Sequence, residues 1–429
     1  MNYRETVKYL FECVPMFQNI GSGAYKEGLD TTRALDSRLG HPHEKYHTIH
    51  VGGTNGKGSC SHTIAAILAS AGYKVGLFTS PHLVDFRERI RVDGEPVPEK
   101  FVVDFVKDHR DFFEPLHPSF FELTTALAFH YFDVMKVDVA VIEVGMGGRL
   151  DCTNIITPDI SVITNISLDH TQFLGHTLAA VAGEKAGIIK PGVPTVIGEY
   201  VDETRPVFEG KAKEANAPII FAQDEDNLIG WKNAEECGYI YQTKDFGEIH
   251  GQLGGISQLK NTKTILTALS ILKEQGYNIN TENVAQGFSN VCGLTGLMGR
   301  WQQLSRHPRA VCDTGHNVAC FEDITRQIAN IDCDKLRMVF GMVGDKDIDG
   351  VLSLLPCDAE YYFCKADIVR AMPEEEMQTK AAAHGLKGRC FDSVAEAYKA
   401  AISESSENDF VFVGGSSFVV ADLLASIMK

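Results

Sequence analysis

Several features that define large classes of protein are missing from this sequence. The eleven cysteines, which run from Cys13 to Cys390, include no Cys-x-x-Cys pair, so their spacing indicates neither a zinc ribbon nor a disulfide framework. No apolar run approaches the roughly 20 residues that a membrane-spanning helix needs, and the first residues lead into no signal-peptide core. We therefore expect a cytoplasmic protein with no membrane partner.

Basic side chains are also scarce. The 429 residues include 40 Lys and Arg against 57 Asp and Glu, which gives a formal net charge of -17. A surface for nonspecific nucleic-acid binding would need a basic face, so we expect no nucleic-acid partner. With 44% hydrophobic and 23% charged residues, the chain is long enough for two or three domains, each with its own core.

The sequence does contain short β-branched runs that alternate with helical stretches. This pattern is typical of an α/β protein with a doubly wound, mainly parallel sheet. The expected strands are 47–51, 73–78, 137–144, 160–163, 193–197 and 218–221, and the expected helices are 59–71, 122–135, 177–188 and 257–275. Residues 230–251 consist of short runs of mixed polarity, which indicate a small antiparallel appendage.

A second α/β series follows a Gly-rich segment, residues 292–299, which we interpret as an interdomain linker. Its expected strands are 310–313, 337–340, 359–363 and 409–413. The predicted organisation is a larger domain, residues 1–296, and a smaller C-terminal α/β domain, residues 297–429.

A glycine-rich loop between a predicted strand and a predicted helix carries the strongest chemical signal. Residues 50–59 read His-Val-Gly-Gly-Thr-Asn-Gly-Lys-Gly-Ser. Glycines let backbone N–H groups turn toward an anion, Lys57 can reach the β- and γ-phosphates, and Ser59 can bind Mg²⁺. The spacing is not a standard Walker A pattern, because Gly52 lies four rather than five residues before Gly56 and Gly58 separates Lys57 from Ser59.

Other candidates follow predicted strands, where open α/β sheets bind their ligands. Glu143 ends an apolar strand and precedes a glycine-rich loop, which favours a metal or substrate carboxylate; the alternative is a capping or loop carboxylate. His170 follows the strand 160–163 together with Asn165 and Asp169. Beside Glu143 and Ser59 it becomes a candidate second-metal ligand, although alone it could equally be a hydrogen-bonded loop histidine. Residue type alone indicates that Lys185 is a solvated helix lysine.

Eight short motifs occur in a fixed order along nearly the whole chain. They are residues 54–59, 79–83, 86–90, 121–122, 143–154, 164–170, 184–187 and 313–317. Together they resemble the motifs of the Mur ligase superfamily, and most closely those of the folylpolyglutamate synthase/dihydrofolate synthase family. The unusual Gly-Lys-Gly-Ser spacing is this family's version of the loop.

The resemblance implies a fold and a reaction. The fold is a Mur ligase-like central P-loop domain with a smaller C-terminal α/β domain of the glutamate ligase type. The activity is ATP-dependent, ADP-forming ligation of L-glutamate to dihydropteroate, to the γ-carboxylate of tetrahydrofolate, or to both, through an acyl phosphate. Residues 149–154 resemble the loop of bifunctional bacterial members, so we expect both activities.

The same resemblance assigns roles to individual residues. Nucleotide contacts are implied for Thr54, Asn55, Gly56, Lys57, Gly58, Ser59, Asn261, Arg300, Asp313 and His316. Two Mg²⁺ sites are implied, with Ser59 and Glu143 at the first, and with His170 and a carbamylated Lys185 at the second. Catalytic roles fall to Lys57, Glu143, His170 and Lys185, and substrate binding to Thr79, Ser80, Pro81, His82, Phe121, Arg149 and Asp151.

Three positions depart from the family pattern near the nucleotide side: Ser257 replaces a common His, Met298 a common Pro and Gly315 a common Ala. None removes an implied phosphate or metal ligand. Two alternative functions stay open. A cell-wall precursor ligase of the Mur type would need an added N-terminal domain, whereas only some 46 residues precede the first strand. In a nucleotide-binding regulatory protein without ligase activity, Glu143, His170 and Lys185 would have no joint purpose. The family suggests a monomer.

Overall fold

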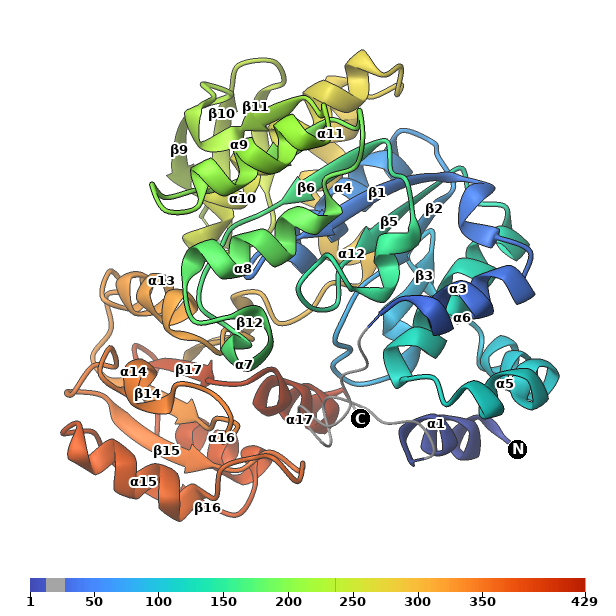
Figure 1. The fold of residues 1–429 in the computed structure, drawn as a ribbon. Helices are drawn as coiled ribbons and strands as arrows, with labels where there is room; N and C mark the ends of the chain where they lie inside the picture. Colours follow the sequence, from blue (N-terminus) through green and yellow to red (C-terminus); the bar gives the residue numbers. More distant parts are fainter. Residues whose placement is uncertain (13–27, 236, 429) are drawn as a thin grey trace. The chain divides into compact units, whose positions relative to one another are not determined.

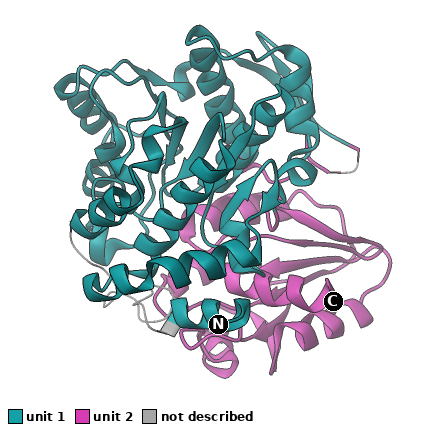
Figure 2. Ribbon diagram, turned by 90° about the vertical axis from the view of Figure 1, so that its right-hand side faces the viewer, with its two compact units in different colours: residues 1–234, 239–252, 258–297 teal, residues 235–238, 253–257, 298–429 magenta. Residues whose placement is uncertain are grey.

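The computed structural model describes residues 1–12, 28–235 and 237–428, which form two compact units (Figure 2). Unit 1 comprises Met1–Ala234, Tyr239–Gln252 and Gln258–Leu297, and unit 2 comprises Glu235–Gly238, Leu253–Ser257 and Met298–Lys429. Among the described residues, no helix combines the length and the apolar character that are required to span a bilayer.

Unit 1 is built on an eight-stranded sheet with the order β4-β3-β2-β5-β1-β6-β7-β8 (Figure 1). The strands are β1 (His47–Gly52), β2 (Val75–Phe78), β3 (Ile90–Val92), β4 (Glu95–Pro96), β5 (Val139–Glu143), β6 (Ile160–Ile163), β7 (Thr195–Ile197) and β8 (Ile219–Phe221). Neighbouring strands from β2 to β8 are parallel, while β3 and β4 pair antiparallel at one edge. The mainly parallel sheet predicted from the sequence is confirmed.

The helices of unit 1 lie before, between and after these strands. They are α1 (Tyr3–Glu12), α3 (Asp30–Arg38), α4 (Lys57–Ser70), α5 (Glu99–Phe113), α6 (Phe120–Met135), α7 (Thr171–Leu174), α8 (Leu178–Lys185), α9 (Arg205–Glu214), α10 (Ser257–Glu274), α11 (Thr281–Ser289) and α12 (Val291–Thr295). Short 3₁₀ turns are η2 (Pro42–Glu44), η3 (Phe86–Arg89), η4 (Glu114–Leu116), η5 (Cys152–Ile155), η6 (Ala186–Ile188) and η7 (Ala222–Asp224).

The two faces of the sheet are buried in separate cores. Val139 and Val141 of β5 belong to one cluster with residues of α4, α10 and α11, while Ala140 and Ile142 belong to a second cluster with residues of α5 and α6. A strand that is buried on both faces reads as a continuous apolar run. The polar residue that ends such a strand, Glu143, therefore stands out as a candidate for function.

A small antiparallel sheet belongs to unit 1, as the short runs of mixed polarity in residues 230–251 predicted. It consists of β9 (Leu228–Asn233), β10 (Tyr239–Thr243) and β11 (Gly247–Gly251), in the order β11-β10-β9. Tyr241 of β10 and Ile249 of β11 pack into the same core as α4 and α10, so the small sheet extends the hydrophobic core on that face.

Unit 2 contains a six-stranded sheet with the order β12-β13-β17-β14-β15-β16. Its strands are β12 (Gln302–Arg306), β13 (Arg309–Cys312), β14 (Leu336–Phe340), β15 (Glu360–Cys364), β16 (Lys387–Phe391) and β17 (Phe410–Gly414), and its helices are α13 (Val318–Ile328), α14 (Ile348–Leu352), α15 (Glu374–Ala383), α16 (Val394–Ser403) and α17 (Ser417–Ile427). The strands from β13 to β16 are parallel, and β12 is antiparallel to β13. The predicted second α/β domain type is confirmed.

Two details differ from the sequence-based expectation. The segment interpreted as a linker begins inside a helix, α12 (Val291–Thr295), whose C-cap Gly296 has a φ of 69°. Four strands were not predicted. β3 and β4 are only 3 and 2 residues long, whereas β12, Gln302–Arg306, and β16, Lys387–Phe391, are partly exposed and largely polar. β12 and β16 lie at edges of their sheet, where a strand needs no continuous apolar run.

Candidate active site

The loop between β1 and α4 has a shape that two of its glycines permit. Gly53 has a φ of 134° and Gly56 a φ of 84°, values that residues with a side chain rarely adopt. A Cβ on Gly53 would lie 2.0 Å from Oγ1 of Thr164, and one on Gly56 would lie 2.3 Å from Oδ1 of Asn261. The loop backbone is thus closely packed on two sides, at the start of a helix whose first N–H groups favour an anion.

Hydrogen bonds hold this loop against the segment that follows β6. The backbone N–H of Thr54 donates to the carbonyl oxygen of Asn165 at 3.0 Å, and that of Asn55 donates to its Oδ1 at 2.9 Å. Oγ1 of Thr54 accepts from the N–H of Ser167 at 3.0 Å. These bonds use backbone and side-chain groups of Asn165 together, so the loop is positioned before any ligand binds.

Two lysine ammonium groups donate to one loop carbonyl. Nζ of Lys57 lies 3.1 Å from the carbonyl oxygen of Gly53 and 3.0 Å from that of Thr54, and Nζ of Lys185 lies 2.8 Å from the same oxygen of Gly53. Burial, and then the charge of Lys57, lowers the pKa of Lys185 to about 7, although Asp169 and Asp151 act in the opposite direction. Lys185 is only 4% exposed, so its interpretation as a solvated helix lysine is wrong.

Glu143 and Ser59 occupy the same end of the sheet. Glu143 is paired in register with Val51 of β1 and is 3% exposed, while Ser59 lies in the first turn of α4 and is 1% exposed. Oγ of Ser59 accepts a hydrogen bond from Nε2 of Gln258 at 3.2 Å. A buried carboxylate and a buried hydroxyl therefore lie on neighbouring elements at the phosphate loop.

This donor set fits Mg²⁺ bound together with phosphate. Within the part of the chain that the structure describes, no group of three or more His, Cys, Asp or Glu side chains is placed to hold a metal ion. Mg²⁺ does not need one, because it usually keeps several waters and binds one or two carboxylates plus substrate phosphates. Ser59 and Glu143 supply the hydroxyl and the carboxylate that such a site requires.

His170 lies beside Asp169 in the segment after β6. Its φ is 50°, its N–H donates to Oδ1 of Asp169 at 2.8 Å, and its Nε2 lies 4.0 Å from that oxygen. The His170 side chain is 31% exposed and that of Asp169 is 9% exposed. Because Asp169 raises the pKa of Lys185, its carboxylate acts on the same part of the loop, a contribution that the sequence did not predict.

The glycine-rich segment after β5 is organised by Asp151. This carboxylate accepts from the N–H of Met146 at 2.9 Å and from the N–H of Thr153 at 3.0 Å, and burial raises its pKa. The guanidinium of Arg149 is paired with Glu184 at 3.0 Å, and its side chain is 56% exposed. Asp151 therefore shapes the segment from within, while Arg149 extends from it.

Four of the residues predicted to bind the substrate, Thr79 to His82, form the segment that directly follows β2. Thr79 is buried, and Ser80 and Pro81 are joined by a cis peptide bond. Nδ1 of His82 accepts from Nε of Arg89 at 2.7 Å, and burial, with the charge of Arg89, lowers the pKa of His82 to about 3. His82 is therefore neutral at physiological pH.

Phe121 connects the two segments. Its ring lies 5.7 Å from that of Phe78 at the end of β2, and a Cβ on Gly145 would lie 2.4 Å from its Cζ. Phe121 is half-buried. It thus packs against the end of β2 and against the loop that follows Glu143.

In unit 2, three predicted nucleotide contacts lie close to one another. Asp313 accepts from the N–H groups of Trp301 and Gly315, both at 2.8 Å, and burial raises its pKa although the charge of Arg300 opposes this. Nδ1 of His316 lies 3.1 Å from the carbonyl oxygen of Thr314, and Arg300 hydrogen-bonds the Thr314 hydroxyl. The loop between β13 and α13 therefore brings Arg300, Asp313 and His316 together within this unit.

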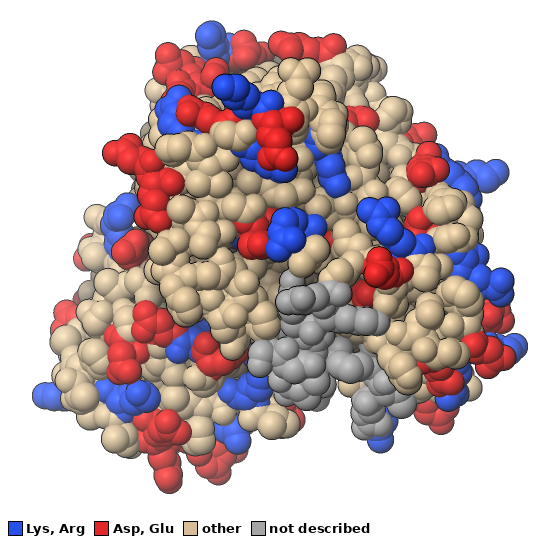
Figure 3. All heavy atoms as spheres, in the orientation of Figure 1, with Lys and Arg blue, Asp and Glu red and all other residues tan. Residues whose placement is uncertain are grey.

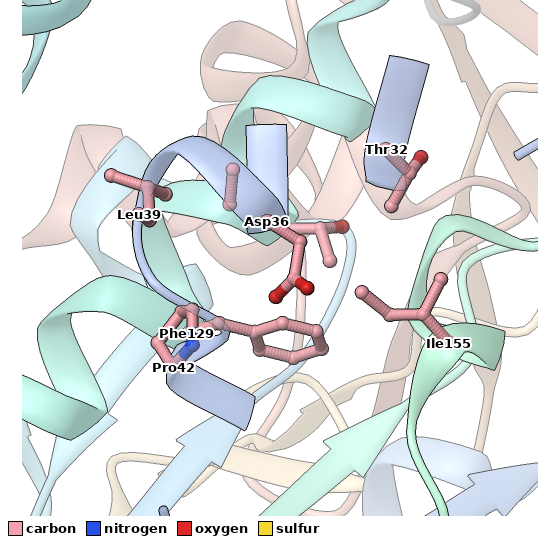
Figure 4. A pocket seen from close by; sticks show the side chains of 8 residues that line it. Thr32, Asp36, Leu39, Pro42, Phe129 and Ile155 are labelled. Carbon is pink, nitrogen blue, oxygen red and sulfur yellow. The ribbon is translucent and has the colours of Figure 1, made fainter. Parts of the chain in front are cut away.

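A small hollow elsewhere in unit 1 contains none of the predicted site residues (Figure 4). It is lined by residues of α3, η2, α6 and η5: Thr32, Asp36, Leu39, Pro42, Thr125, Ala126, Phe129 and Ile155. The carboxylate of Asp36 accepts from Nδ1 of His41 and Nδ1 of His43, both at 2.7 Å. These two histidines thus share a structural partner.

Sequence reasoning underestimated two residues of the phosphate loop's surroundings. Asn165 was noted only as a polar group after a strand, although it binds the loop through its backbone and its side chain. Gln258 was assigned no role, although it contacts Ser59. Their position, directly after a strand or in the first turn of a helix, was the available signal.

On the molecular face drawn in Figure 3, acidic and basic side chains are interspersed.

Two protein-family models match the sequence. Residues 51–268 match the Mur ligase middle domain, and residues 299–417 match the Mur ligase glutamate ligase domain. Together these matches include the phosphate loop, Lys185, Asn261, Arg300 and His316.

Curated relatives align over most of the chain. A dihydrofolate synthase/folylpolyglutamate synthase from Escherichia coli is 32% identical over 415 residues, which cover 96% of this chain and 93% of the relative. A probable bifunctional folylpolyglutamate synthase/dihydropteroate synthase from Haloferax volcanii is 34% identical over 438 residues. This alignment covers 98% of the chain but 50% of the relative, so the chain spans about half the length of that protein.

Solved structures are similar along the full chain. The E. coli protein FolC in complex with DHPP and ADP has a TM-score of 0.84 at 31% identity, covering 100% of this chain and 98% of that one. The bifunctional folylpolyglutamate synthase/dihydrofolate synthase from Yersinia pestis, complexed with AMPPNP and a Mn ion, has a TM-score of 0.81 at 29% identity, covering 100% of this chain and 98% of that one. Fold and sequence therefore point to the same family.

Proposed function

The chain belongs to the folylpolyglutamate synthase/dihydrofolate synthase family of Mur ligases, and from that premise we propose that it ligates L-glutamate to folates at the expense of ATP. The observation that carries the proposal is the combination at one sheet edge of a phosphate loop, a buried Glu143 and a buried Lys185 that shares a loop carbonyl with Lys57. A protein that only binds nucleotide would use the loop and a carboxylate for Mg²⁺, but it would not need the buried Lys185.

ATP binds at the loop in this proposal. Gly56, Gly58 and the start of α4 supply N–H groups to the phosphates, and Lys57 supplies charge. Thr54 and Asn55 line the nucleotide while their N–H groups anchor the loop on Asn165. The amide of Asn261 lies against Gly56, which supports its role beside the nucleotide. The related structures that contain ADP or AMPPNP support the same choice of ligand.

Mg²⁺ is proposed at two sites. Ser59 and Glu143 would hold the ion that accompanies the β- and γ-phosphates, and His170 with carbamylated Lys185 would hold the second. When bound, Mg²⁺ neutralises phosphate charge and so favours attack on the γ-phosphate. The manganese in the Yersinia pestis relative supports a divalent cation in this family.

Carbamylation of Lys185 is supported by its pKa. In this reaction the neutral amine nitrogen bonds to the carbon of CO₂, one N–H proton is lost to solvent, and the product carries a terminal carboxylate. An ordinary lysine is almost entirely protonated near pH 7, whereas an amine with a pKa of about 7 is roughly half neutral there. The same change would convert a repelled cation beside Lys57 into an anion that a cation can stabilise.

The reaction then has two transfers. A folate or pteroate carboxylate oxygen bonds to the γ-phosphorus, and ADP leaves. The amine of L-glutamate attacks the resulting acyl carbon, loses a proton, and expels inorganic phosphate as the amide forms. Lys57 and the N–H groups of the loop stabilise the phosphoryl charge, so alignment and electrostatics, rather than a covalent enzyme intermediate, lower the barrier.

The pterin is proposed to bind between the segments after β2 and β5. Thr79, Ser80, Pro81 and His82 belong to the first, Arg149 and Asp151 to the second, and Phe121 packs against both. Arg149 is the exposed cation of this group, which suits a substrate carboxylate. The loop at residues 149–154 supports both the dihydropteroate and the tetrahydrofolate reactions.

The remaining assignments concern the whole chain. Residues 1–296 are proposed to bind ATP and pterin, and residues 297–429 to contribute Arg300, Asp313 and His316 to the nucleotide. The protein is further proposed to be cytoplasmic and to act as a monomer. Sedimentation of the purified protein, with and without ATP, tests the monomer.

A direct assay tests the activity. Purified protein is incubated with ATP, Mg²⁺ and L-glutamate, with either dihydropteroate or tetrahydrofolate, and phosphate release is compared with the mass gain of one glutamate. Turnover with both acceptors is expected; ATP binding without turnover of either would contradict the proposal.

Variants of two lysines locate the chemistry. Lys185→Ala should lower turnover by at least about 100-fold, the scale of losing a charge stabiliser, and change ATP affinity far less. Lys263→Ala is the control, because Lys263 donates to the carbonyl of Gln223, outside the phosphate loop and the predicted substrate segments. Equal losses in the two variants would refute the placement of Lys185.

A further inference from the structure

A chain of side-chain hydrogen bonds leads from Ser59 into α10. Nε2 of Gln258 donates to Oγ of Ser59 at 3.2 Å, and Oε1 of Gln258 accepts from Nδ2 of Asn261 at 3.0 Å. All three residues are buried, with exposures of 1%, 6% and 6% for Ser59, Gln258 and Asn261. Gln258 is thus the link between a hydroxyl at the phosphate loop and the amide that lies against Gly56.

The direction of these bonds determines what the Ser59 hydroxyl can still do. A serine hydroxyl has one hydrogen to donate and two lone pairs to accept or coordinate with. Gln258 occupies one lone pair with an N–H group. One lone pair and the hydroxyl hydrogen remain, which match a metal ion and a phosphate oxygen respectively.

Asn261 sets the orientation of the glutamine amide. Because its Nδ2 donates to Oε1 of Gln258, the opposite end of that amide, Nε2, is directed to Ser59. The Oδ1 atom of Asn261 then faces Gly56, where a Cβ would lie 2.3 Å away. In this arrangement each of the two bonds joins one amide N–H group to one oxygen acceptor.

We propose that Gln258 is a positioning residue for the metal-nucleotide complex, acting through the lone pairs of Ser59. Its N–H keeps the Ser59 hydrogen directed away from α10, so that the hydroxyl presents an acceptor to the cation and a donor to the phosphates. The inference rests on the proposed function in one respect, namely that Ser59 takes part in binding Mg²⁺ with ATP. It adds a residue whose effect depends on the cation.

Binding of ATP with and without Mg²⁺ tests this role, independently of ligation. ATP affinity is measured by calorimetry in EDTA and in saturating Mg²⁺ for the wild type and for Gln258→Met, which keeps the length of the side chain and removes the donor. We expect the Mg²⁺-dependent gain in affinity to fall about three- to tenfold, the worth of one net hydrogen bond, while the affinity in EDTA stays within about twofold. An equal loss under both conditions would overturn the proposal.

A second variant and a control separate positioning from packing. Gln258→Glu keeps an acceptor toward Asn261 but replaces the donor toward Ser59, so it should also reduce the Mg²⁺-dependent gain; a wild-type response would contradict the inference. Thr264→Val changes another buried residue of α10, whose hydroxyl donates to the carbonyl of Lys260, and should leave the gain unchanged.

A double-mutant cycle tests the route through the hydroxyl. In a Ser59→Ala background, Gln258→Met should have no further effect on the Mg²⁺-dependent gain, because its partner has gone. Additive losses would show that Gln258 acts elsewhere and would overturn the inference. If the wild type shows Mg²⁺-dependent ATP binding without glutamate ligation, the proposed function fails while this test still decides the role of Gln258.

Discussion

Lys185→Met should make the protein more stable while it removes activity. The lysine is 4% exposed, and its pKa falls from 10.5 to about 7 because of burial and the charge of Lys57. That difference corresponds to a penalty of about 5 kcal/mol at neutral pH. Methionine avoids the penalty but loses the hydrogen bond to Gly53, which is worth about 1 kcal/mol, so we expect a net stabilisation of about 2–4 kcal/mol at pH 7.

The gain should depend on pH in one direction. Since the folded-state pKa of Lys185 is about 7 and the ordinary value is 10.5, the unfolded state binds more protons between these values. The stability of the wild type therefore rises with pH across this window. The advantage of the variant should be largest at and below pH 7 and should vanish as the pH approaches 10.5.

Thermal unfolding at several pH values between 6 and 10.5 provides the measurement. Buffers must be free of CO₂, because carbamylation would replace the ammonium by an anion. Lys190→Met is the matched control, since the pKa of Lys190 is lowered to about 8 by burial and then by the charge of Arg33, which predicts a smaller gain. A variant that is less stable than the wild type at pH 7, or a difference that does not change with pH, would refute the reasoning.

Three further changes have outcomes that follow from contacts in the structure. Gly53→Ala should abolish ATP binding in calorimetry, because its Cβ would lie 2.0 Å from Oγ1 of Thr164; Gly210→Ala, where no atom lies within 4 Å, should bind normally. Arg337→Met should destabilise unit 2 by about 3–5 kcal/mol in unfolding experiments. The buried carboxylate of Asp409 lies 3.1 Å from Nη2 of Arg337 and would lose its cation. The same change at the exposed Arg389 is the control and should cost less than about 1 kcal/mol. Asp36→Asn should lower the melting temperature at pH 7 and should lower it less at a pH below the ordinary aspartate pKa of 3.8. Burial raises the pKa of Asp36, hydrogen bonds from His43 and His41 outweigh it, and the net lowering stabilises the fold only while the carboxylate is ionised. An equal loss at both pH values would contradict that account.

The sequence predicted those parts of the fold that burial dictates. β5 is buried on both faces, so its residues Val139–Glu143 had to form an apolar run, and the glycine loop had to follow a strand and precede a helix. The edge strand β16 could not be predicted in this way, because Lys387–Phe391 is largely polar and partly exposed. The boundary between the two units falls inside the predicted linker, residues 292–299, but the first residues of that segment form the helix α12, which its glycine content did not predict.

The candidate site divides along the same line. Lys57 and Ser59 could be identified from spacing, because the chemistry of phosphate binding fixes which residue types follow the glycines. The burial of Lys185 could not be identified from spacing, because Lys185 and its partner Gly53 are 132 residues apart in the sequence and α8 brings them together. The roles of Asn165 and Gln258 depend on which atom of an amide faces which neighbour, and only the three-dimensional structure provides that information.

The two ammonium groups on the Gly53 carbonyl have a consequence for ligand selection. Each nitrogen lies about 3 Å from the same oxygen, so while Lys185 is protonated and not carbamylated the two charges repel each other by an amount on the order of 3 kcal/mol at an effective dielectric constant of about 20. An anion that draws Lys57 away from this oxygen gains its own attraction to the loop and also relieves the repulsion. The loop is therefore set to discriminate by charge before it discriminates by shape, and a neutral molecule of the same size gains nothing from displacing Lys57.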